Sequence, residues 1–375
     1  MDLQFEWVET WEDVCSPLFV EQWKRWVETA DNSHVFSHPE LALAWIATYR
    51  SLWNMSPRFL IARSEGMEVF FPLVVWTRNA KHLWQRLLVP VGYADFDYCE
   101  PLLVGGLQNN SWAEIWRMLK AEIIRHLGNE VDQVDIPGIR QEIGDRDSAT
   151  LGESCAYLDL NGIPEGGDIL ELLKRSHRQP LERRLRRLQE MGGVTLHVYE
   201  ESEQKELARG LGSFLQHHRR RWPNAYKAPN LHDRLVNAAM RAGLLHFAEL
   251  RLVTGQAICW QIGFIWRGTY YAYQFVYDPE FAKLSPGQVC LLFCIRDSCK
   301  RGLKTFDHLR GEEAYKSGWA SGQVRLLNIR ICGSRSFLRL RSWLANKVQL
   351  MAGSVTRSRR RVVTEQPDEQ KIDPA

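Results

Sequence analysis

A short stretch near residue 310 gathers many side chains that can take part in acid–base chemistry. The run "FDHLRGEEAYKSGWA", Phe306 to Ala320, directly follows an apolar strand candidate. Its ionisable members are Asp307, His308, Arg310, Glu312, Glu313, Tyr315 and Lys316. Side chains of these types at the end of a buried strand are typical of a functional site rather than of packing.

The types in this cluster suit the direct transfer of a group to an amine or a hydroxyl. Asp307 or Glu312 would accept the proton of the attacking group, and Tyr315 would return one to a leaving thiolate. Lys316 and Arg310 suit an anionic donor or a developing oxyanion. Because Lys316 lies beyond the buried part of the strand, we expect Lys316→Ala to lower turnover with little loss of fold.

Two members of the cluster also have a purely structural interpretation. Glu313 and Lys316 are spaced as an ordinary i,i+3 ion pair on a helix. For His308 we prefer a core histidine whose hydrogen bonds are satisfied.

A helix start is predicted upstream, in "KLSPGQVCLLFCIRDSCKRG", Lys283 to Gly302. Ser285 is expected to cap the first turn, Pro286 suits the first helical position, and Gln288 completes a capping-box pattern. The residues that follow are apolar on nearly every face, which predicts a buried helix ending at Gly302.

The same junction has the properties of a phosphate site. A strand ending at Tyr277-Asp278 leads into it, and Gly287 leaves room for close approach to the backbone. The free amides of the first turn and the positive end of the helix dipole attract anions. The alternative is a well-capped core helix that binds nothing.

The order of elements around these segments predicts an α+β protein with an internal repeat. Helices over residues 17–55 precede β-rich runs from Arg58 to about residue 91, an amphipathic helix near 109–129 and a strand at 130–139. Helices over 172–193 and 203–222 precede three strands in 244–278, the helix at 286–301 and the strand "KTFDHLRG". We expect residues 1–158 and 159–345 to form two domains of one architecture, with a linker at 159–170 and a basic, then disordered tail over 346–375.

Composition narrows the class of protein and its expected location. The chain has 375 residues, 45% apolar and 25% charged, with a net charge of +3. These values are ordinary for a soluble protein of about two domains. The absence of a signal peptide or a membrane span predicts a cytoplasmic location. The eight cysteines form no Cys-x-x-Cys pair, which predicts reduced, mostly buried thiols and no metal, including at Cys290, Cys294 and Cys299.

Positive charge is concentrated in two places. "KRSHRQPLERRLRR", residues 174–187, is either a solvated helix face or a contact for an anionic ligand. Residues 323–363 contain no acidic side chain, and their apolar positions at 337–350 are interleaved with arginines. That segment either packs across the enzyme or rests on anionic lipid as a peripheral membrane contact. Nucleic acid is not the expected partner, because a base-stacking platform is missing.

These motifs together resemble the GNAT-type acetyltransferases of the CelD-like family, associated with cellulose and exopolysaccharide biosynthesis. The matching positions, in order, are Tyr277-Asp278, Ser285-Pro286-Gly287, Gly302, Phe306-Asp307, Arg310-Gly311 and Tyr315-Lys316. "VFSHPELALAW", "RSHRQPLERRLRRLQEMGG" and "HRRRW" resemble the same family. The family is related to the Fem-type aminoacyl transferases, which also have two GNAT-like domains. Ser-Pro-Gly stands here where typical GNAT enzymes have a Gly-rich phosphate loop.

The resemblance implies tandem GNAT-like domains, each a mixed, mostly antiparallel sheet flanked by helices. The second domain would bind acyl-CoA, most simply acetyl-CoA, and the first would shape the acceptor groove. The donor contacts would be Asp278, Ser285, Pro286, Gly287, Gln288 and Arg310. The acceptor would be an amino or hydroxyl group of a sugar, a glycan precursor or a lipid-linked sugar.

Two other functions stay open at this point. One is a Fem-type transferase that uses aminoacyl-tRNA and binds it through residues 174–187. The other is a non-catalytic scaffold of a polysaccharide-synthesis assembly.

Overall fold

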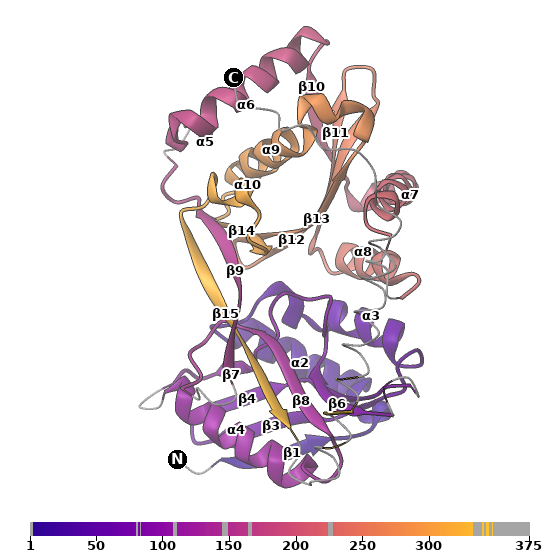
Figure 1. The fold of residues 1–375 in the computed structure, drawn as a ribbon, viewed down its shortest axis with the longest axis vertical. Coiled ribbons are helices and arrows are strands. Elements are labelled where there is room, and N and C mark those ends of the chain that lie inside the picture. The colour runs from indigo at the N-terminus through magenta and orange to yellow at the C-terminus, as the bar shows by residue number, and fades with distance from the viewer. Residues whose placement is uncertain are drawn as a thin grey trace.

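The computed structural model shows two lobes, one built by each half of the chain (Figure 1). It describes residues 3–332 apart from 80, 81, 83, 108–110, 145–148, 164–166 and 224–227. In the C-terminal segment it describes Leu340, Trp343, Leu344 and Lys347. The predicted disordered tail lies outside the described residues, as does most of the predicted amphipathic segment.

The N-terminal half contains the following elements: β1 (Gln4–Val8), α1 (Trp11–Val14), α2 (Pro17–Thr29), η1 (Val35–Ser37), α3 (Pro39–Tyr49), β2 (Met55–Pro57), β3 (Phe59–Ser64), β4 (Met67–Phe71), β5 (Leu73–Thr77), β6 (Arg86–Pro90), β7 (Leu102–Val104), α4 (Trp112–Leu127) and β8 (Gln133–Ile139). Local sequence accounts for the helix starts. Ser16 accepts from the amide of Phe19 ahead of α2, and Ser111 and Glu114 form a capping box on α4.

The C-terminal half repeats this order with additions: β9 (Ala149–Asp159), α5 (Ile169–Leu172), α6 (Arg175–Glu190), β10 (Val194–Val198), η3 (Glu201–Glu203), α7 (Gln204–Arg221), α8 (Leu231–Arg241), β11 (Leu245–Leu252), β12 (Ala257–Trp266), β13 (Thr269–Tyr277), η4 (Pro279–Leu284), α9 (Pro286–Lys300), β14 (Thr305–Arg310), α10 (Ala314–Ser317) and β15 (Gly322–Cys332). The predicted helix, three antiparallel strands, helix and strand are present here as α7 with α8, β11 to β13, α9 and β14.

One sheet runs through both halves. Its strand order is β10-β11-β12-β13-β14-β9-β15-β8-β6-β5-β2, and a separate sheet has the order β1-β3-β4-β7. Strand β15 returns from the C-terminal half and pairs with both β9 and β8. Strands β9 and β15 therefore join the two lobes, as Figure 1 shows. The division at residue 158/159 stays a prediction; that position falls inside β9.

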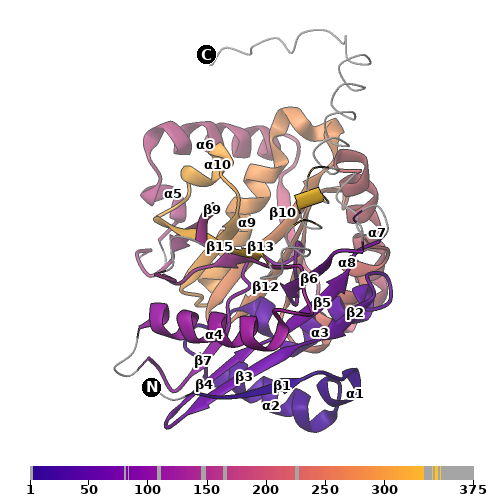
Figure 2. The ribbon, with the colours of Figure 1, turned by 60° about the horizontal axis from the view of Figure 1, so that its bottom comes forward.

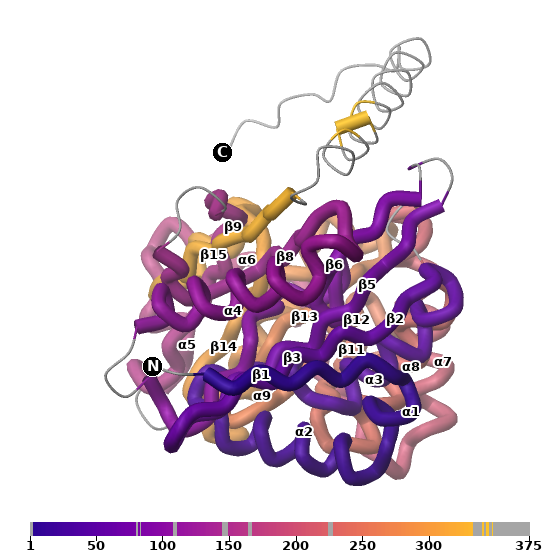
Figure 3. The backbone as a smooth tube through the Cα atoms, turned by 90° about the horizontal axis from the view of Figure 1, so that it is seen from below, coloured from indigo at the N-terminus to yellow at the C-terminus, as the bar shows by residue number. Residues whose placement is uncertain are grey.

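The two halves also share an apolar core. Phe36 of the N-terminal half has its ring centroid 6.3 Å from that of Phe264 and 6.2 Å from that of Tyr271, both in the C-terminal half. A second core cluster packs α9 against the strands of the C-terminal half and against α6. Figure 2 shows α9 between α6 and these strands, with β1 and α2 at the opposite, lower edge of the molecule. In Figure 3, seen from below, β1 crosses in front of the other strands.

No described helix is long and apolar enough to cross a membrane. Among the described residues there is also no group of three or more His, Cys, Asp or Glu side chains placed to hold a metal ion. All eight cysteines are free, and Cys290 and Cys294 of α9 are buried.

Candidate active site

The candidate site lies where two parallel strands separate. Strands β13 and β14 pair at Thr269 with Thr305, Tyr270 with Phe306 and Tyr271 with Asp307. Beyond these positions β13 continues to Tyr277 without further pairing to β14. Strand β14 has an irregular register there, and Leu309 adopts a φ of 58°. The strands therefore open into a gap, and α9, the crossover helix between them, begins at its wide end.

A cavity of about 210 Å³ occupies this gap. Its lining comes from four consecutive parts of the fold: Gln261 of β12; Ala272, Phe275 and Tyr277 of β13; Ala282, Ser285, Gly287, Gln288 and Leu291 around the start of α9; and His308 and Tyr315. The cavity thus connects the first turn of α9 with two members of the ionisable cluster.

The first turn of α9 begins at Pro286, as predicted, but its capping is different. The predicted capping box is wrong, because Ser285 makes no side-chain hydrogen bond to the first turn. Ser285 also ends η4 and precedes a proline, and its backbone is held in the left-handed region with φ 49° and ψ 53°. The side chain of Gln288 instead accepts a hydrogen bond of 3.2 Å from Nε1 of Trp319. The first turn therefore has no side-chain cap from Ser285, although the Gln288 amide donates to the Ser285 carbonyl oxygen at 3.1 Å.

Gly287 allows a ligand close to this turn. A Cβ atom at this position would lie 3.1 Å from Cε2 of Phe275 and 3.7 Å from Cδ1 of Tyr277. A larger side chain would therefore project into the space between α9 and β13. The uncapped amides and the positive helix end beside that space are suited to an anion.

His308 is buried, with 3% of its surface exposed, and it lines the cavity. Its Nε2 atom has no hydrogen-bond partner among the described residues. The expectation of a satisfied core histidine is therefore wrong. Burial, together with the nearby positive charge of Lys316, lowers the pKa of His308 to about 3. The ring is neutral at physiological pH and can offer Nε2 to a ligand in the cavity.

Tyr315, on α10, closes the cavity from the side of β14. Its ring meets that of Phe275 edge-on, with 6.0 Å between the centroids. Burial raises the pKa of Tyr315, and the negative charge of Glu313 adds to the effect. The hydroxyl therefore keeps its proton at neutral pH and can donate a hydrogen bond to a developing anion.

Asp307 lies on the other face of β14, because side chains alternate along a strand. Its carboxylate accepts hydrogen bonds from the Tyr98 hydroxyl at 2.7 Å and from the Leu309 amide at 2.8 Å. Burial raises the pKa of Asp307 to about 6, although both hydrogen bonds act in the opposite direction. A carboxyl group with this pKa is a suitable base at neutral pH.

Comparison with known proteins agrees with this geometry. The family profile described as "Acetyltransferase (GNAT) domain" matches residues 175–317, a range that contains the cavity from Gln261 to Tyr315. The chain carries a GNAT acetyltransferase domain. It is accordingly an acyltransferase.

Solved structures resemble most of the chain, not the GNAT domain alone. FemX matches with a TM-score of 0.57 and 10% identity over 82% of this chain and 95% of its own. The C-terminal domain of a putative lysylphosphatidylglycerol synthetase from Agrobacterium fabrum matches with a TM-score of 0.52 and 12% identity, over 83% of this chain and 90% of its own. At these identities the likeness concerns the fold, and it confirms the predicted mixed α+β, GNAT-like fold class. No curated protein matches the sequence.

Two predicted residues lie near the GNAT cavity but are engaged elsewhere. Lys316 is buried, contrary to expectation, and its Nζ donates to the carbonyl oxygen of Arg310 at 2.7 Å and pairs with Glu313 at 3.0 Å. The guanidinium of Arg310 pairs with Asp97 of the N-terminal half at 3.0 Å. Neither cation is among the residues that line the cavity.

Two further predicted residues of the GNAT domain lie outside the cavity lining. Glu312 is exposed and pairs with Arg325 at 3.0 Å. Asp278 caps η4 by accepting a hydrogen bond of 3.0 Å from the amide of Glu280.

The structure places one further cationic side chain beside the cavity, which the sequence pattern alone did not assign to the site. The guanidinium carbon of Arg221, in the last turn of α7, lies 4.7 Å from the ring centroid of Tyr277, which lines the cavity. Arg221 is exposed, and it forms no ion pair with any described carboxylate. The run "HRRRW" shows in the sequence that positive charge is concentrated there, but only the packing of α7 against β13 places it beside the GNAT cavity.

Proposed function

We propose that this acyltransferase moves an acyl group, most simply acetyl, from acyl-CoA to an amino or hydroxyl group of a sugar or polysaccharide precursor. The observation that carries the proposal is the cavity that joins the uncapped start of α9 to His308 and Tyr315. It has a place for a diphosphate at one end and polar side chains for a thioester at the other.

The donor would enter with its diphosphate against the amide of Gly287 and the positive end of α9, since the Gln288 amide already donates to the Ser285 carbonyl oxygen at 3.1 Å. Backbone amides at a helix start hold phosphate groups without requiring a lysine or arginine. Arg221, over the ring of Tyr277, would add positive charge at the wide end of the gap. The pantetheine arm would then run between β13 and β14 toward His308.

The transfer would be direct. The acceptor nitrogen or oxygen attacks the thioester carbon from the Asp307 face of β14, and Asp307 takes the proton that the acceptor loses. The new C–N or C–O bond replaces the C–S bond. CoA leaves as the thiolate, and the Tyr315 hydroxyl donates a hydrogen bond to its sulfur. His308 donates from Nε2 to the thioester oxygen as negative charge develops on it.

Lys316 and Arg310 receive different roles from those first expected. Lys316 would hold the end of β14 through the carbonyl of Arg310, and Arg310 would hold the N-terminal half through Asp97. Both would therefore position the cluster rather than touch the donor. Glu312 is a weaker candidate for the base because it is exposed and paired with Arg325.

The sugar acceptor is supported by the resemblance to the CelD-like family and by the arrangement of the two halves. Asp307 faces Tyr98 of the N-terminal half, so an acceptor that reaches it would contact both halves. The test is release of CoA thiol from acetyl-CoA in the presence of amino sugars, neutral sugars and lipid-linked sugars. Acceptor-dependent release that is lost in His308→Ala supports the proposal, and no release with any of these acceptors contradicts it.

A second candidate is the Fem-type transfer from aminoacyl-tRNA, favoured by two basic surfaces. Helix α6 buries Leu181 and Leu188 and exposes Arg183, Arg186 and Arg187. Helix α7 ends in three exposed arginines, Arg219 to Arg221. Retention of tRNA at low salt, with loss at moderate salt and aminoacyl transfer in place of acetyl transfer, would favour this candidate.

A further inference from the structure

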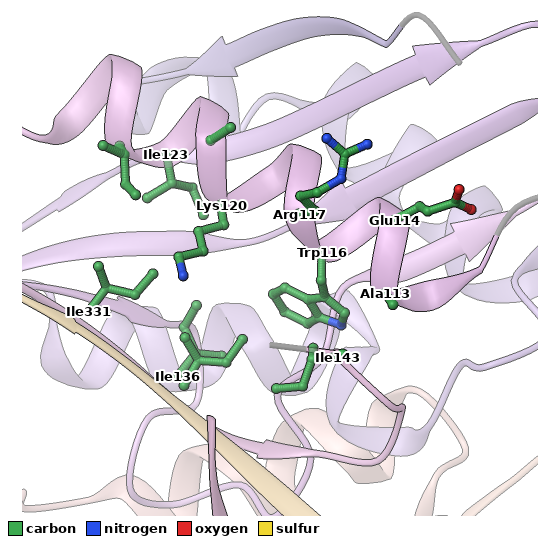
Figure 4. A pocket seen from close by; sticks show the side chains of 13 residues that line it. Ala113, Glu114, Trp116, Arg117, Lys120, Ile123, Ile136, Ile143 and Ile331 are labelled. Atoms are coloured by element: carbon green, nitrogen blue, oxygen red, sulfur yellow. The ribbon is translucent and has the colours of Figure 1, made fainter. Parts of the chain in front are cut away.

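A second concavity lies on the N-terminal half, away from the acyltransferase site. It has a volume of about 600 Å³ and lies between α4 and the sheet strands β8 and β15 (Figure 4). Its surface is mostly apolar and is formed by Trp116, Ile123 and Ile124 of α4, Ile136 of β8, and Ile329 and Ile331 of β15. We call it the α4 groove.

The α4 groove exposes apolar surface to solvent. The side chain of Ile124 is 40% exposed, although α4 is otherwise an amphipathic helix with its apolar face toward the sheet. Apolar clefts of this volume are typical of binding sites. Nothing in the GNAT reaction uses it.

A matching apolar surface lies in the C-terminal segment of the same chain. Leu340, Trp343, Leu344 and Lys347 are helical and stand at i, i+3, i+4 and i+7, so they share one face. Leu340, Trp343 and Leu344 are 52%, 51% and 39% exposed. The ammonium of Lys347 lies 4.4 Å from the Trp343 ring centroid. This face has no partner of its own in the described part of the chain.

Connectivity places the two surfaces within reach of each other. Ile331 is part of the groove, and the chain leaves β15 one residue later, at Cys332. Residues 333–339 separate Cys332 from Leu340, and an extended stretch of that length spans roughly 23–25 Å. Two surfaces separated by so few residues of one chain meet at an effective concentration on the order of millimolar.

We propose that the face formed by Leu340, Trp343, Leu344 and Lys347 docks into the α4 groove of its own chain. The attraction is the burial of apolar side chains on both surfaces. Charge opposes it, because Arg117 and Lys120 outnumber Glu114 around the groove. The segment itself carries Arg341 and Lys347, with Arg335 and Arg339 just before it. Salt screens this repulsion, so docking strengthens as salt rises. Binding of the same segment to an anionic membrane would weaken as salt rises.

Disulfide trapping tests the docking. Ile124→Cys and Leu344→Cys are combined in a chain whose two exposed cysteines, Cys15 and Cys332, are replaced by serine. The control combines Leu344→Cys with Arg125→Cys, since Arg125 is on α4 but pairs with Glu122 away from the groove. We expect monomeric cross-linking roughly tenfold faster than in the control, increasing with salt, as an elevated effective concentration requires.

The proposal would be overturned if the two cysteine pairs cross-linked at equal rates or if the cross-links formed mainly between chains. A cross-linking rate that falls as salt rises would also overturn it. A second measurement needs no cysteine. The full chain carrying Trp343→Glu and Leu344→Glu should bind several-fold more of an apolar dye than the natural chain, and adding Ile124→Glu should remove the excess. Unchanged dye binding in that double variant, with the natural chain sedimenting on anionic vesicles at low salt, would assign the segment to a membrane instead.

Discussion

Tyr98 in the N-terminal half donates a hydrogen bond of 2.7 Å to Oδ2 of Asp307, at the end of β14 in the C-terminal half. The bond crosses between the two lobes and stabilises the charged form of a buried carboxylate. Burial has the larger effect, so the pKa of Asp307 is raised to about 6. The protonation state of the proposed base therefore depends on a residue more than 200 positions away in the sequence.

Activity should rise with pH through about 6, because Asp307 must lose its proton to act as the base. Tyr98→Phe removes a hydrogen bond that favours the charged form, so the rise should move to higher pH. Asp307→Asn should remove it and leave little activity. The pH dependence of kcat/KM for the three proteins measures this. An unchanged pH profile in Tyr98→Phe would show that the protonation state of Asp307 does not control the rate.

The same carboxyl group should affect stability with a definite sign. The pKa of Asp307 is about 6 in the folded protein and near 3.8 in an unfolded chain, so the folded state holds the proton longer. Its contribution is fully present below pH 3.8 and is lost as pH rises through 6, by an amount on the order of 3 kcal/mol. Urea unfolding across this range should show the loss in the natural protein and not in Asp307→Asn. Parallel curves for the two proteins would contradict the assignment.

His308→Phe should reduce kcat/KM by about a hundredfold or more while leaving the melting temperature nearly unchanged. The substitution fills the site but removes a nitrogen that already lacks a partner. His246→Phe is the matched control, because His246 is also buried but contacts Asp297 at 2.9 Å and the Tyr270 hydroxyl at 3.3 Å. His246→Phe should lose stability, because it removes both of these hydrogen bonds. The assignment of His308 to the active site would be wrong if His308→Phe kept full activity, or if it lost as much stability as His246→Phe.

Lys316→Ala should destabilise the fold by roughly 2–3 kcal/mol, since it leaves the buried carbonyl groups of Leu309 and Arg310 without a donor. Arg325→Ala is the comparison. It breaks an exposed pair with Glu312 and should cost less than about 1 kcal/mol. Denaturant unfolding of both variants checks this, and equal stabilities would show that Lys316 is not a structural tie.

The order of the elements around the GNAT domain was predictable because each has a local signal. Ser-Pro-Gly marked the start of α9, and alternating apolar residues marked β11 to β13. Strand β15, "GQVRLLNIRIC", was missed because charged and amide side chains interrupt its apolar positions. Its pairing with both β8 and β9 is a long-range property that no local pattern contains.

The candidate site was predictable in location but not in detail. The sequence predicted chemistry at residues 307–316 and at the start of α9, and the cavity joins the two. It did not show that His308 and Asp307 face opposite sides of β14, nor that Lys316 is buried beneath Glu313 and the backbone. These differences depend on the bulge near Leu309 and on the loop that follows it.

Gly287 provides the most direct variant of the donor site. Gly287→Val should weaken acyl-CoA binding roughly tenfold or more, which corresponds to about 1.4 kcal/mol, because the new side chain enters the space beside Phe275. Gly212→Val on α7 is the control, since a Cβ atom there would meet no atom within 4 Å. Thermal unfolding should show both variants folded.

Isothermal titration of acetyl-CoA into the natural protein, Gly287→Val and Gly212→Val tests the donor site most directly. We expect saturable binding of acetyl-CoA to the natural protein and to Gly212→Val, and a loss of affinity for acetyl-CoA in Gly287→Val. No binding to the natural protein, or equal affinity in all three, would contradict an acyl-CoA site at the start of α9.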